Sequence, residues 1–324
     1  MFRTAWLLLT FILLHPLAAR SDQATALDVA KRLGLSEASI EKVRRGEVVV
    51  EELEPSSDKD LSLALVAAVD APLEQVREFV QADRMAELST VTLSHGEIDT
   101  KTFSLAAMKL PDAVLDRLVR DPAGTFFLSD AEASRIAEAG KQGRAQALEA
   151  YQSVLSARAK AYWEKGLAGI EPYAGAGRSP ATDLGHADEA ARKLVRSPAV
   201  LNALDTPPSK ADSAAVHSLG WAIQKGRDQA APVLIHRIRH EGKEGDIYID
   251  RRFYSGYDYD ALQVVTGVVS ASEKRCAVFY TNHTFTAQVT GFGGGAKRSI
   301  GRKLMSGELV SEIQRAQKAV AAQP

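Results

Sequence analysis

The sequence has almost no cysteine. Cys276 is the single one among 324 residues, so an intrachain disulfide bond is excluded. A chain of this length buries enough surface to fold without such a crosslink. Cys276 lies in a run of residues typical of a strand, and we expect a small buried side chain there rather than a reactive thiol.

An excess of charge of one sign is also absent. The chain has 40 Lys and Arg residues against 41 Asp and Glu residues, which gives a formal net charge of -1 at pH 7. Without a basic surplus there is no general electrostatic attraction to nucleic acid, and we expect no nucleic-acid partner. Hydrophobic residues make up 45% of the chain, as in packed globular proteins and unlike disordered chains.

The apolar run near the N-terminus is too short to span a membrane. It extends from Ala5 to Leu14, whereas a helix needs about 20 apolar residues to cross a bilayer core. Arg3 precedes the run, and the small residues Ala19 and Ser21 follow it. This pattern predicts a cleaved signal peptide over residues 1–21, with an uncleaved anchor as the alternative. We therefore expect a periplasmic or extracellular protein without a stable membrane anchor.

The next part of the chain has mostly the period of helices. Short helical patterns cover Ala24 to Leu35 and Ser36 to Arg45, and the second can be capped by its first serine. An apolar strand over Leu61 to Val69 then leads through Pro72 into a further helix. From about Leu110 to Leu204 the pattern is again helical.

Beyond Pro208 the apolar period changes to two residues, which is typical of strands. The expected strands are His217 to Gln224, Val233 to His240, Asp246 to Tyr254, Ala261 to Ser270 and Cys276 to Phe285. Their connections are short, so neighbouring strands must be antiparallel. A terminal helix follows, and we expect its apolar face to carry Ile300, Leu304, Leu309, Ile313 and Val320.

The strand from Ala261 to Val269 is apolar on both sides. Leu262, Val264 and Val268 alternate with Ala261, Val265 and Val269. Both faces of such a strand need cover. We expect the terminal helix to pack on one face and the helical segment to pack on the other.

The order of these elements resembles the helix-grip fold of the START and polyketide-cyclase-like superfamily. An early strand enters a helix through Val69 to Glu74, several antiparallel strands follow, and a long helix ends the chain. The resemblance covers about residues 58–100 and 213–322 and rests on pattern rather than on a diagnostic motif. It implies an apolar cavity that holds a lipid or another hydrophobic molecule. The helical stretch between the two blocks would be an insertion.

The fold class expected is therefore α+β, with an antiparallel sheet closed by a long C-terminal helix and a large helical insertion. The chain divides into a signal peptide (1–21), N-terminal helices (22–57), a first strand-helix part (58–109), the helical insertion (110–208), and the sheet with its C-terminal helix (209–324).

A glycine-rich segment, Gly291 to Arg298, lies between the last strand and the terminal helix. A dinucleotide site would need a second strand with an acid about 20 residues further on, and a P-loop would need a hydroxyl where Arg298 stands. We exclude both and expect no cofactor. An anion at the helix start remains possible; its contacts would be Gly293, Gly294, Lys297 and Arg298. The alternative is a tight turn followed by solvated cations, because cations gain nothing from the dipole at this end.

Metal sites are not expected. His236 and His240 would share one face of a strand about 13 Å apart, too far for one metal ion. The aspartates of the strand region lack the order of a calcium loop, and we expect them to pair across strands with Arg251 or Arg252. These aspartates are Asp246, Asp250, Asp258 and Asp260.

No serine-hydrolase motif G-x-S-x-G occurs in the sequence. We expect a non-catalytic exported protein that binds a hydrophobic or lipid-like small molecule. The sequence does not indicate a protein partner. The contacts expected in its pocket are Trp221, His236, Tyr254 and Tyr280. One alternative is a hydrolase or cyclase that acts on an amphipathic substrate through His236 and an acid such as Asp250. Another is an envelope interaction module that binds a protein through the segment from Leu110 to Leu204.

Overall fold

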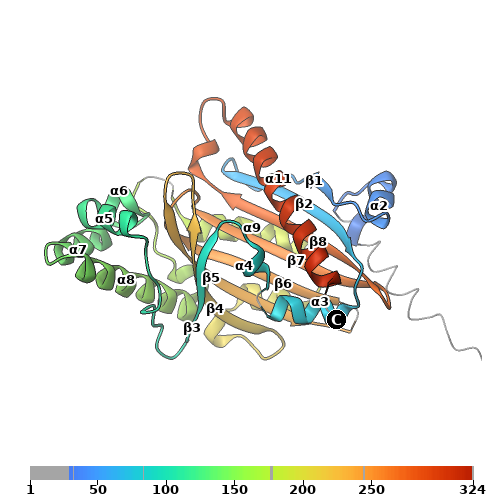
Figure 1. Ribbon diagram of the computed structural model, residues 1–324, viewed down its shortest axis with the longest axis horizontal. Coiled ribbons are helices and arrows are strands. Elements are labelled where there is room, and N and C mark those ends of the chain that lie inside the picture. Colours follow the sequence, from blue (N-terminus) through green and yellow to red (C-terminus); the bar gives the residue numbers. More distant parts are fainter. Residues whose placement is uncertain (1–28, 32, 83, 176–177, 244, 323–324) are drawn as a thin grey trace, which may run out of the picture.

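One antiparallel sheet of eight strands organises the computed structural model, which describes residues 29–322 except 32, 83, 176–177 and 244 (Figure 1). The predicted signal peptide, residues 1–21, lies outside the described residues. The strand order across the sheet is β1-β2-β8-β7-β6-β5-β4-β3. The strands are β1 (Val49–Glu52), β2 (Asp60–Val69), β3 (Thr92–Ile98), β4 (Val216–Lys225), β5 (Ala230–Glu241), β6 (Gly245–Ser255), β7 (Ala261–Ser272) and β8 (Arg275–Phe285).

The strands expected from the two-residue period are all confirmed. β4 to β8 form a meander of antiparallel neighbours, as their short connections require. The early strand β2 pairs with the last strand, so that Asp60 lies opposite Phe285 and Val69 lies opposite Cys276. Cys276 is fully buried as expected, and burial raises its pKa to about 11. The edge strands β1 and β3 were not predicted, because β1 has only four residues and β3 carries polar residues on most positions.

Helices fill the segments between the strands. Ser36 caps α2, because its side chain accepts a hydrogen bond from the Ser39 backbone N–H at 3.1 Å. Of the helix expected over Ala24 to Leu35, residues 29–31 are helical and residues 24–28 lie outside the described part. The helices are α2 (Glu37–Arg44), α3 (Leu73–Gln81), α4 (Arg84–Leu88), α5 (Asp112–Arg120), α6 (Pro122–Thr125), α7 (Asp130–Gly140), α8 (Arg144–Lys165), α9 (Pro180–Leu194), α10 (Pro198–Asp205) and α11 (Gly294–Ala321).

Different helices cover the two faces of the sheet. In Figure 1, α3, α4 and α11 lie in front of the sheet and α9 lies behind it. On the front face, Val268 of β7 belongs to a buried cluster with Val320 of α11. On the rear face, Val265 of β7 packs in a cluster with Ala191 of α9 and Val200 of α10. The expectation that both faces of this strand are covered, one by the terminal helix and one by the helical segment, is confirmed.

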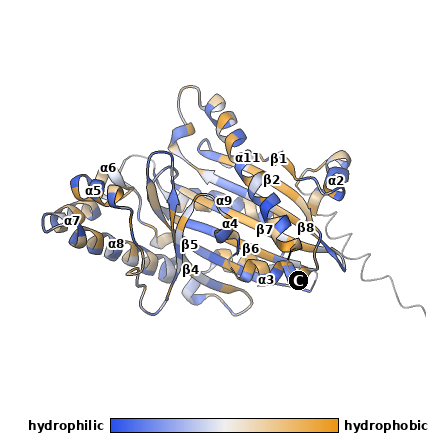
Figure 2. Cartoon of the chain, viewed as in Figure 1, coloured by the Kyte–Doolittle hydropathy of each residue, from blue (hydrophilic) through white to orange (hydrophobic). Residues whose placement is uncertain are grey.

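The apolar face expected for α11 is not continuous. Val320 is 3% exposed, but Ile300 and Leu304 are 63% and 69% exposed. The step of five residues from Leu304 to Leu309 turns the side chain by about 140° around the helix axis, so the two leucines do not share a face. The prediction of one apolar face was wrong for this reason. Figure 2 shows hydrophobic and hydrophilic residues alternating along the helix.

α11 rests directly on β2. A Cβ atom added to Gly301 would lie 3.2 Å from the Leu61 side chain, so the helix and the strand are in close contact there. Further along, the Gln317 side chain donates a hydrogen bond of 2.6 Å to the backbone carbonyl of Ala68. Leu63, on the same face of β2 as Leu61, is 1% exposed. Side chains therefore fill the contact between α11 and β2.

This packing predicts a large loss of stability in the variant Leu63→Ala. The variant leaves a cavity in the covered strand, and its free energy of unfolding should fall by about 2–5 kcal/mol in urea denaturation. The matched control is Leu93→Ala on β3, where the leucine is 54% exposed. Its effect should stay within about 0.5 kcal/mol. Equal losses in the two variants would contradict the assignment of Leu63 to the core.

Candidate functional site

The four side chains expected to line one pocket lie on two faces of the sheet. Trp221, His236 and Tyr254 are buried toward the rear face, where they are 5%, 0% and 0% exposed. Tyr280 lies on the front face with Val278, two residues away on β8. The structure therefore brings three of the four residues to one side, and it buries them among other protein side chains.

A bulge in β6 places Tyr254 in the core. The register between β5 and β6 shifts after the pair Leu234 and Tyr254, so Phe253 is the extra residue. As a result, the consecutive side chains Phe253 and Tyr254 both join the rear core cluster. The Tyr254 hydroxyl hydrogen-bonds to the Tyr151 hydroxyl at 2.9 Å. A strand pattern alone could not reveal this bulge, because the alternation of side chains is broken at one position.

Both ring nitrogens of His236 are occupied. Nδ1 lies 2.8 Å from the Tyr162 hydroxyl, and Nε2 lies 3.0 Å from Nδ1 of His217. Burial lowers the pKa of His236 well below its ordinary value, so the ring is neutral. Asp250, its suggested catalytic partner, lies opposite Arg237 and is within 3.8 Å of that guanidinium. The structure does not bring His236 and Asp250 together.

Arg251 extends this buried network between the helices and the sheet. Its guanidinium donates to the Tyr162 hydroxyl of α8 and to the Gln263 side chain of β7, both at 3.0 Å. It also donates to Asp188 of α9 at 2.5 Å. Arg251 and Asp188 are 3% and 4% exposed. A buried charge must be paired and hydrogen-bonded, so this network holds α8 and α9 on the sheet.

The strand aspartates find partners other than those expected. The predicted partners were Arg251 and Arg252. Instead, Arg251 forms its ion pair with Asp188. Arg252 donates hydrogen bonds to Gln224 and Tyr259. The observed partners are Arg77 for Asp246, Arg237 for Asp250, the Arg227 backbone N–H for Asp258, and Arg178 with Lys59 for Asp260. Most of these partners lie outside the neighbouring strand, where a cross-strand rule cannot find them.

The glycine-rich segment before α11 forms a tight turn. Gly293 has a left-handed φ of 73°, and the Gly294 N–H donates to the Gly291 carbonyl at 3.0 Å. Arg298 donates to the backbone carbonyl of Asp58 at 2.8 Å, and Lys297 lies 3.5 Å from the Thr290 carbonyl. This arrangement favours a turn followed by cations over an anion cradle.

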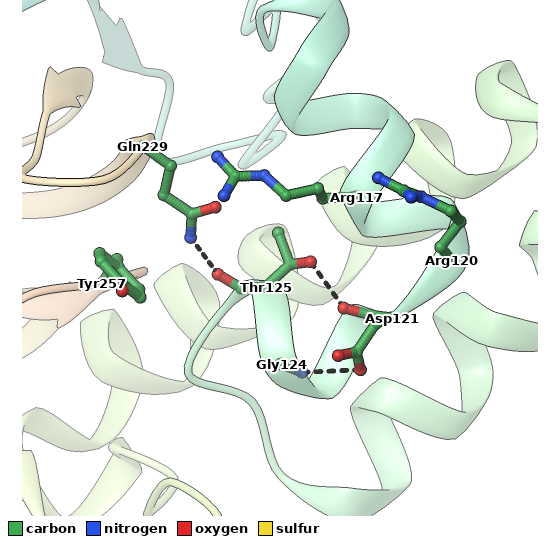
Figure 3. Close-up of a pocket in the computed structure, with 7 residues that line it drawn as sticks. All are labelled: Arg117, Arg120, Asp121, Gly124, Thr125, Gln229 and Tyr257. Atoms are coloured by element: carbon green, nitrogen blue, oxygen red, sulfur yellow. Dashed lines mark hydrogen bonds between the residues drawn. The ribbon is translucent and has the colours of Figure 1, made fainter.

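A pocket of about 300 Å³ lies between the helical segment and two turns of the sheet (Figure 3). Its lining residues are Arg117 and Arg120 of α5, Asp121, Gly124 and Thr125 at α6, Gln229 before β5, and Tyr257 between β6 and β7. None of them was predicted as a site residue. The one hint in the sequence is the spacing of the two arginines, because residues three apart on a helix are neighbours.

The α6 side of the pocket is fixed by hydrogen bonds. The Asp121 side chain accepts from the Gly124 N–H at 2.9 Å, which caps this short helix. A Cβ atom at Gly124 would lie 2.0 Å from the Asp121 carboxylate, so a side chain at this position would displace the capping carboxylate. The buried Gln229 donates through its side-chain amide to the Thr125 carbonyl and joins α6 to the sheet.

Among the described residues, the partners of the two pocket arginines are backbone carbonyls. Arg117 donates to the Asp228 carbonyl at 3.5 Å, and Arg120 donates to the Asp116 carbonyl at 3.3 Å. Within the described part of the chain, neither arginine forms an ion pair with a carboxylate. Each guanidinium carries five N–H donors, so most of these donors are left for a ligand. Two guanidinium groups that line one pocket suit an anion.

A second pocket of about 500 Å³ adjoins α3 and the turn between β5 and β6. Its cations are Arg77 and Lys243, and its acids include Glu241. Arg77 contacts Asp246 at 2.9 Å and Glu74 at 2.5 Å. Carboxylates of the protein therefore neutralise the charge of Arg77. Neither pocket lies between α11 and the sheet.

The buried ion pair predicts a strong coupling between Arg251 and Asp188. Arg251→Met leaves a buried carboxylate unpaired and should lower the free energy of unfolding by about 3–5 kcal/mol. The double variant Arg251→Met/Asp188→Asn should lose less than the sum of the two single variants, as measured by urea denaturation. Additive losses would contradict the pairing.

The neutral His236 predicts a loss of stability in mild acid. The unfolded chain takes up a proton near the ordinary pKa of 6.5, whereas burial keeps the folded ring neutral. The free energy of unfolding should therefore fall as pH drops below 6.5, with a slope of up to about 1.4 kcal/mol per pH unit from this group. His236→Gln should reduce the slope, because it removes the group that takes up a proton only in the unfolded chain. An unchanged slope in His236→Gln would refute the assignment.

Among the residues that the structure describes, no group of three or more His, Cys, Asp or Glu side chains is placed to hold a metal ion. No helix in this same part of the chain is long and apolar enough to cross a membrane.

The chain matches no protein-family model and no curated protein.

Proposed function

We propose that this protein is a non-catalytic binding protein and that its ligand carries an anionic group. The observation that supports this proposal is the pair Arg117 and Arg120, which line the 300 Å³ pocket without a carboxylate partner among the described residues. Hydrogen bonds from a guanidinium to an anion are among the strongest in proteins.

The hydrogen bonds of the other lining groups support binding rather than catalysis. The Asp121 carboxylate accepts from the Gly124 N–H and serves as a helix cap. The Tyr257 hydroxyl donates to Asp228 at 3.3 Å, and burial raises its pKa, so it stays protonated. A nucleophile held by a general base is the usual arrangement for covalent catalysis. The lining residues do not offer such a pair.

The ligand class that we propose is an amphipathic, lipid-like molecule bound by its acidic head. The pocket is at the lower end of the range of about 300–1,000 Å³ for small-molecule sites, which suits a head group better than a whole lipid. Export to the periplasm or the extracellular space and a helix-grip relationship remain part of this proposal. They rest on the N-terminal pattern and on the order of strands and helices.

The proposal predicts that arginine variants weaken binding of anions. Thermal unfolding with inorganic phosphate, a short alkyl phosphate, a fatty acid and an uncharged alkyl glucoside should show stabilisation by anionic compounds only. Arg117→Ser and Arg120→Ser should each weaken binding by about 10- to 100-fold in titration calorimetry. The matched control is Arg135→Ser, an exposed arginine on α7.

Four results distinguish a lipid-like ligand from a simple anion and from the absence of an anion site. Tighter binding of the alkyl phosphate than of phosphate supports a lipid-like ligand, whereas equal binding supports a simple anion. No stabilisation by any anion would overturn the proposal, and so would equal losses in Arg135→Ser and Arg117→Ser. Mass spectrometry after incubation with a cell-envelope lipid extract would then identify a retained molecule.

A further inference from the structure

The first half of α11 exposes an apolar strip to solvent. Phe292 is fully exposed, and Ile300 and Leu304 are 63% and 69% exposed. Ala296, which is also exposed, lies four residues before Ile300 on α11, and Phe292 lies in the turn that precedes the helix. We call Phe292, Ala296, Ile300 and Leu304 the outer strip. Large apolar side chains on a protein surface are informative when they are contiguous.

The geometry of the helix aims this strip away from the sheet. Residues four apart lie one above the other on a helix face. Gly301, one residue beyond Ile300, faces Leu61 on β2, and the Met305 sulfur accepts a hydrogen bond from Thr284 of β8. The side of the helix that carries Ile300 and Leu304 therefore has no strand beneath it.

Phe292 stands at the tip of the turn that leads into α11. The glycines on either side, Gly291 and Gly293, have left-handed φ angles of 72° and 73°. Such angles are easy for glycine and strained for other residues, so the turn projects the phenylalanine between two positions without side chains. An aromatic ring presented in this way costs free energy in water and gains it in an apolar or interfacial environment.

Cations predominate around the strip, although the exposed Glu308 lies one helical turn beyond Leu304. From Gly294 to Gly307 the sequence contains four cations and no acid. Lys297 and Lys303 are exposed on the two flanks of the strip. The other two cations turn toward the sheet, where Arg298 donates to the Asp58 carbonyl and Arg302 pairs with Glu52 at 3.1 Å.

We propose that the outer strip docks on an anionic lipid membrane surface. Phe292, Ile300 and Leu304 would enter the interface, and Lys297 and Lys303 would contact acidic head groups. An apolar face flanked by lysines is the usual composition of a helix that lies on a membrane. The residues differ from those of the ligand pocket, so the two proposals succeed or fail separately.

Vesicle flotation tests the proposal with the purified chain. The probes are vesicles of phosphatidylcholine alone and of phosphatidylcholine mixed with phosphatidylglycerol. Binding should require the anionic lipid and should weaken as salt rises, because salt screens surface charges. Every variant carries the same N-terminus, so differences between variants report on α11.

Apolar and charge variants separate the two contributions. Phe292→Ser and the double variant Ile300→Ser/Leu304→Ser should each reduce the vesicle-bound fraction at least about tenfold. Lys297→Glu and Lys303→Glu should each weaken binding at least about fivefold on anionic vesicles. The matched controls are Leu93→Ser and Val216→Ser, exposed apolar residues on β3 and β4, and Lys109→Glu, an exposed lysine before α5. The controls should bind as the parent chain does.

A fluorescent label gives a readout of insertion. Cys276 is buried, so a polarity-sensitive dye on Ala296→Cys labels the outer strip alone, and the same dye on Val216→Cys labels a control position. The emission should shift to the blue with anionic vesicles at position 296 only. Equal binding to neutral vesicles, equal losses in the control variants, or no shift at position 296 would overturn the proposal. Dimerisation that is abolished by Phe292→Ser, in the absence of lipid, would assign the strip to a second copy of the chain and would also overturn it.

Discussion

The buried charge of Arg251 is the constraint on which the arrangement of the helices depends. A guanidinium inside a protein needs a partner for its charge and acceptors for its N–H groups. Asp188 of α9 supplies the charge, and Tyr162 of α8 and Gln263 of β7 supply acceptors. These contacts fix two helices against the rear face of the sheet. Because α5 and α7 pack against α8, the same contacts set the position of the helix that carries the pocket arginines.

A second buried guanidinium joins α8 to α7. Arg158 of α8 is 4% exposed and binds Glu132 at the start of α7, with distances of 2.6 and 2.7 Å. The guanidinium also lies 5.2 Å from the centre of the Tyr254 ring, a favourable cation-aromatic geometry. Together with Arg251, it makes the interface between the helical segment and the sheet depend on polar contacts as well as on apolar burial.

Local patterns predicted the strands well because each strand obeys a short-range rule. The period of two residues and the short connections were enough to find β4 to β8 and to make them antiparallel. They could not show that β6 contains a bulge at Phe253, or that Tyr280 and His236 face opposite sides of the sheet. These facts depend on the register between strands, which the sequence of a single strand does not contain.

The candidate pocket could not be predicted from the sequence for a related reason. Its residues come from α5, α6 and two turns that are distant in the chain, and none of them belongs to a recognised motif. The terminal helix was predicted, but the side that it turns to the sheet was not. Its apolar residues suggested one continuous apolar face, whereas the step of five residues between Leu304 and Leu309 places these two side chains on different sides of the helix.

The pairing of β2 with β8 has a consequence for how the chain folds. The two strands come from opposite ends of the described chain, yet they are neighbours along their full length in the middle of one half of the sheet. The ladder between them must wait until β8 leaves the ribosome, and closing so long a loop is entropically costly. The β4–β8 meander can assemble from neighbouring strands alone, so β2 pairs late with a sheet that has already formed. Folding of this kind is slow, and until the early strand arrives, the unpaired edge of β8 is open to pairing with another chain.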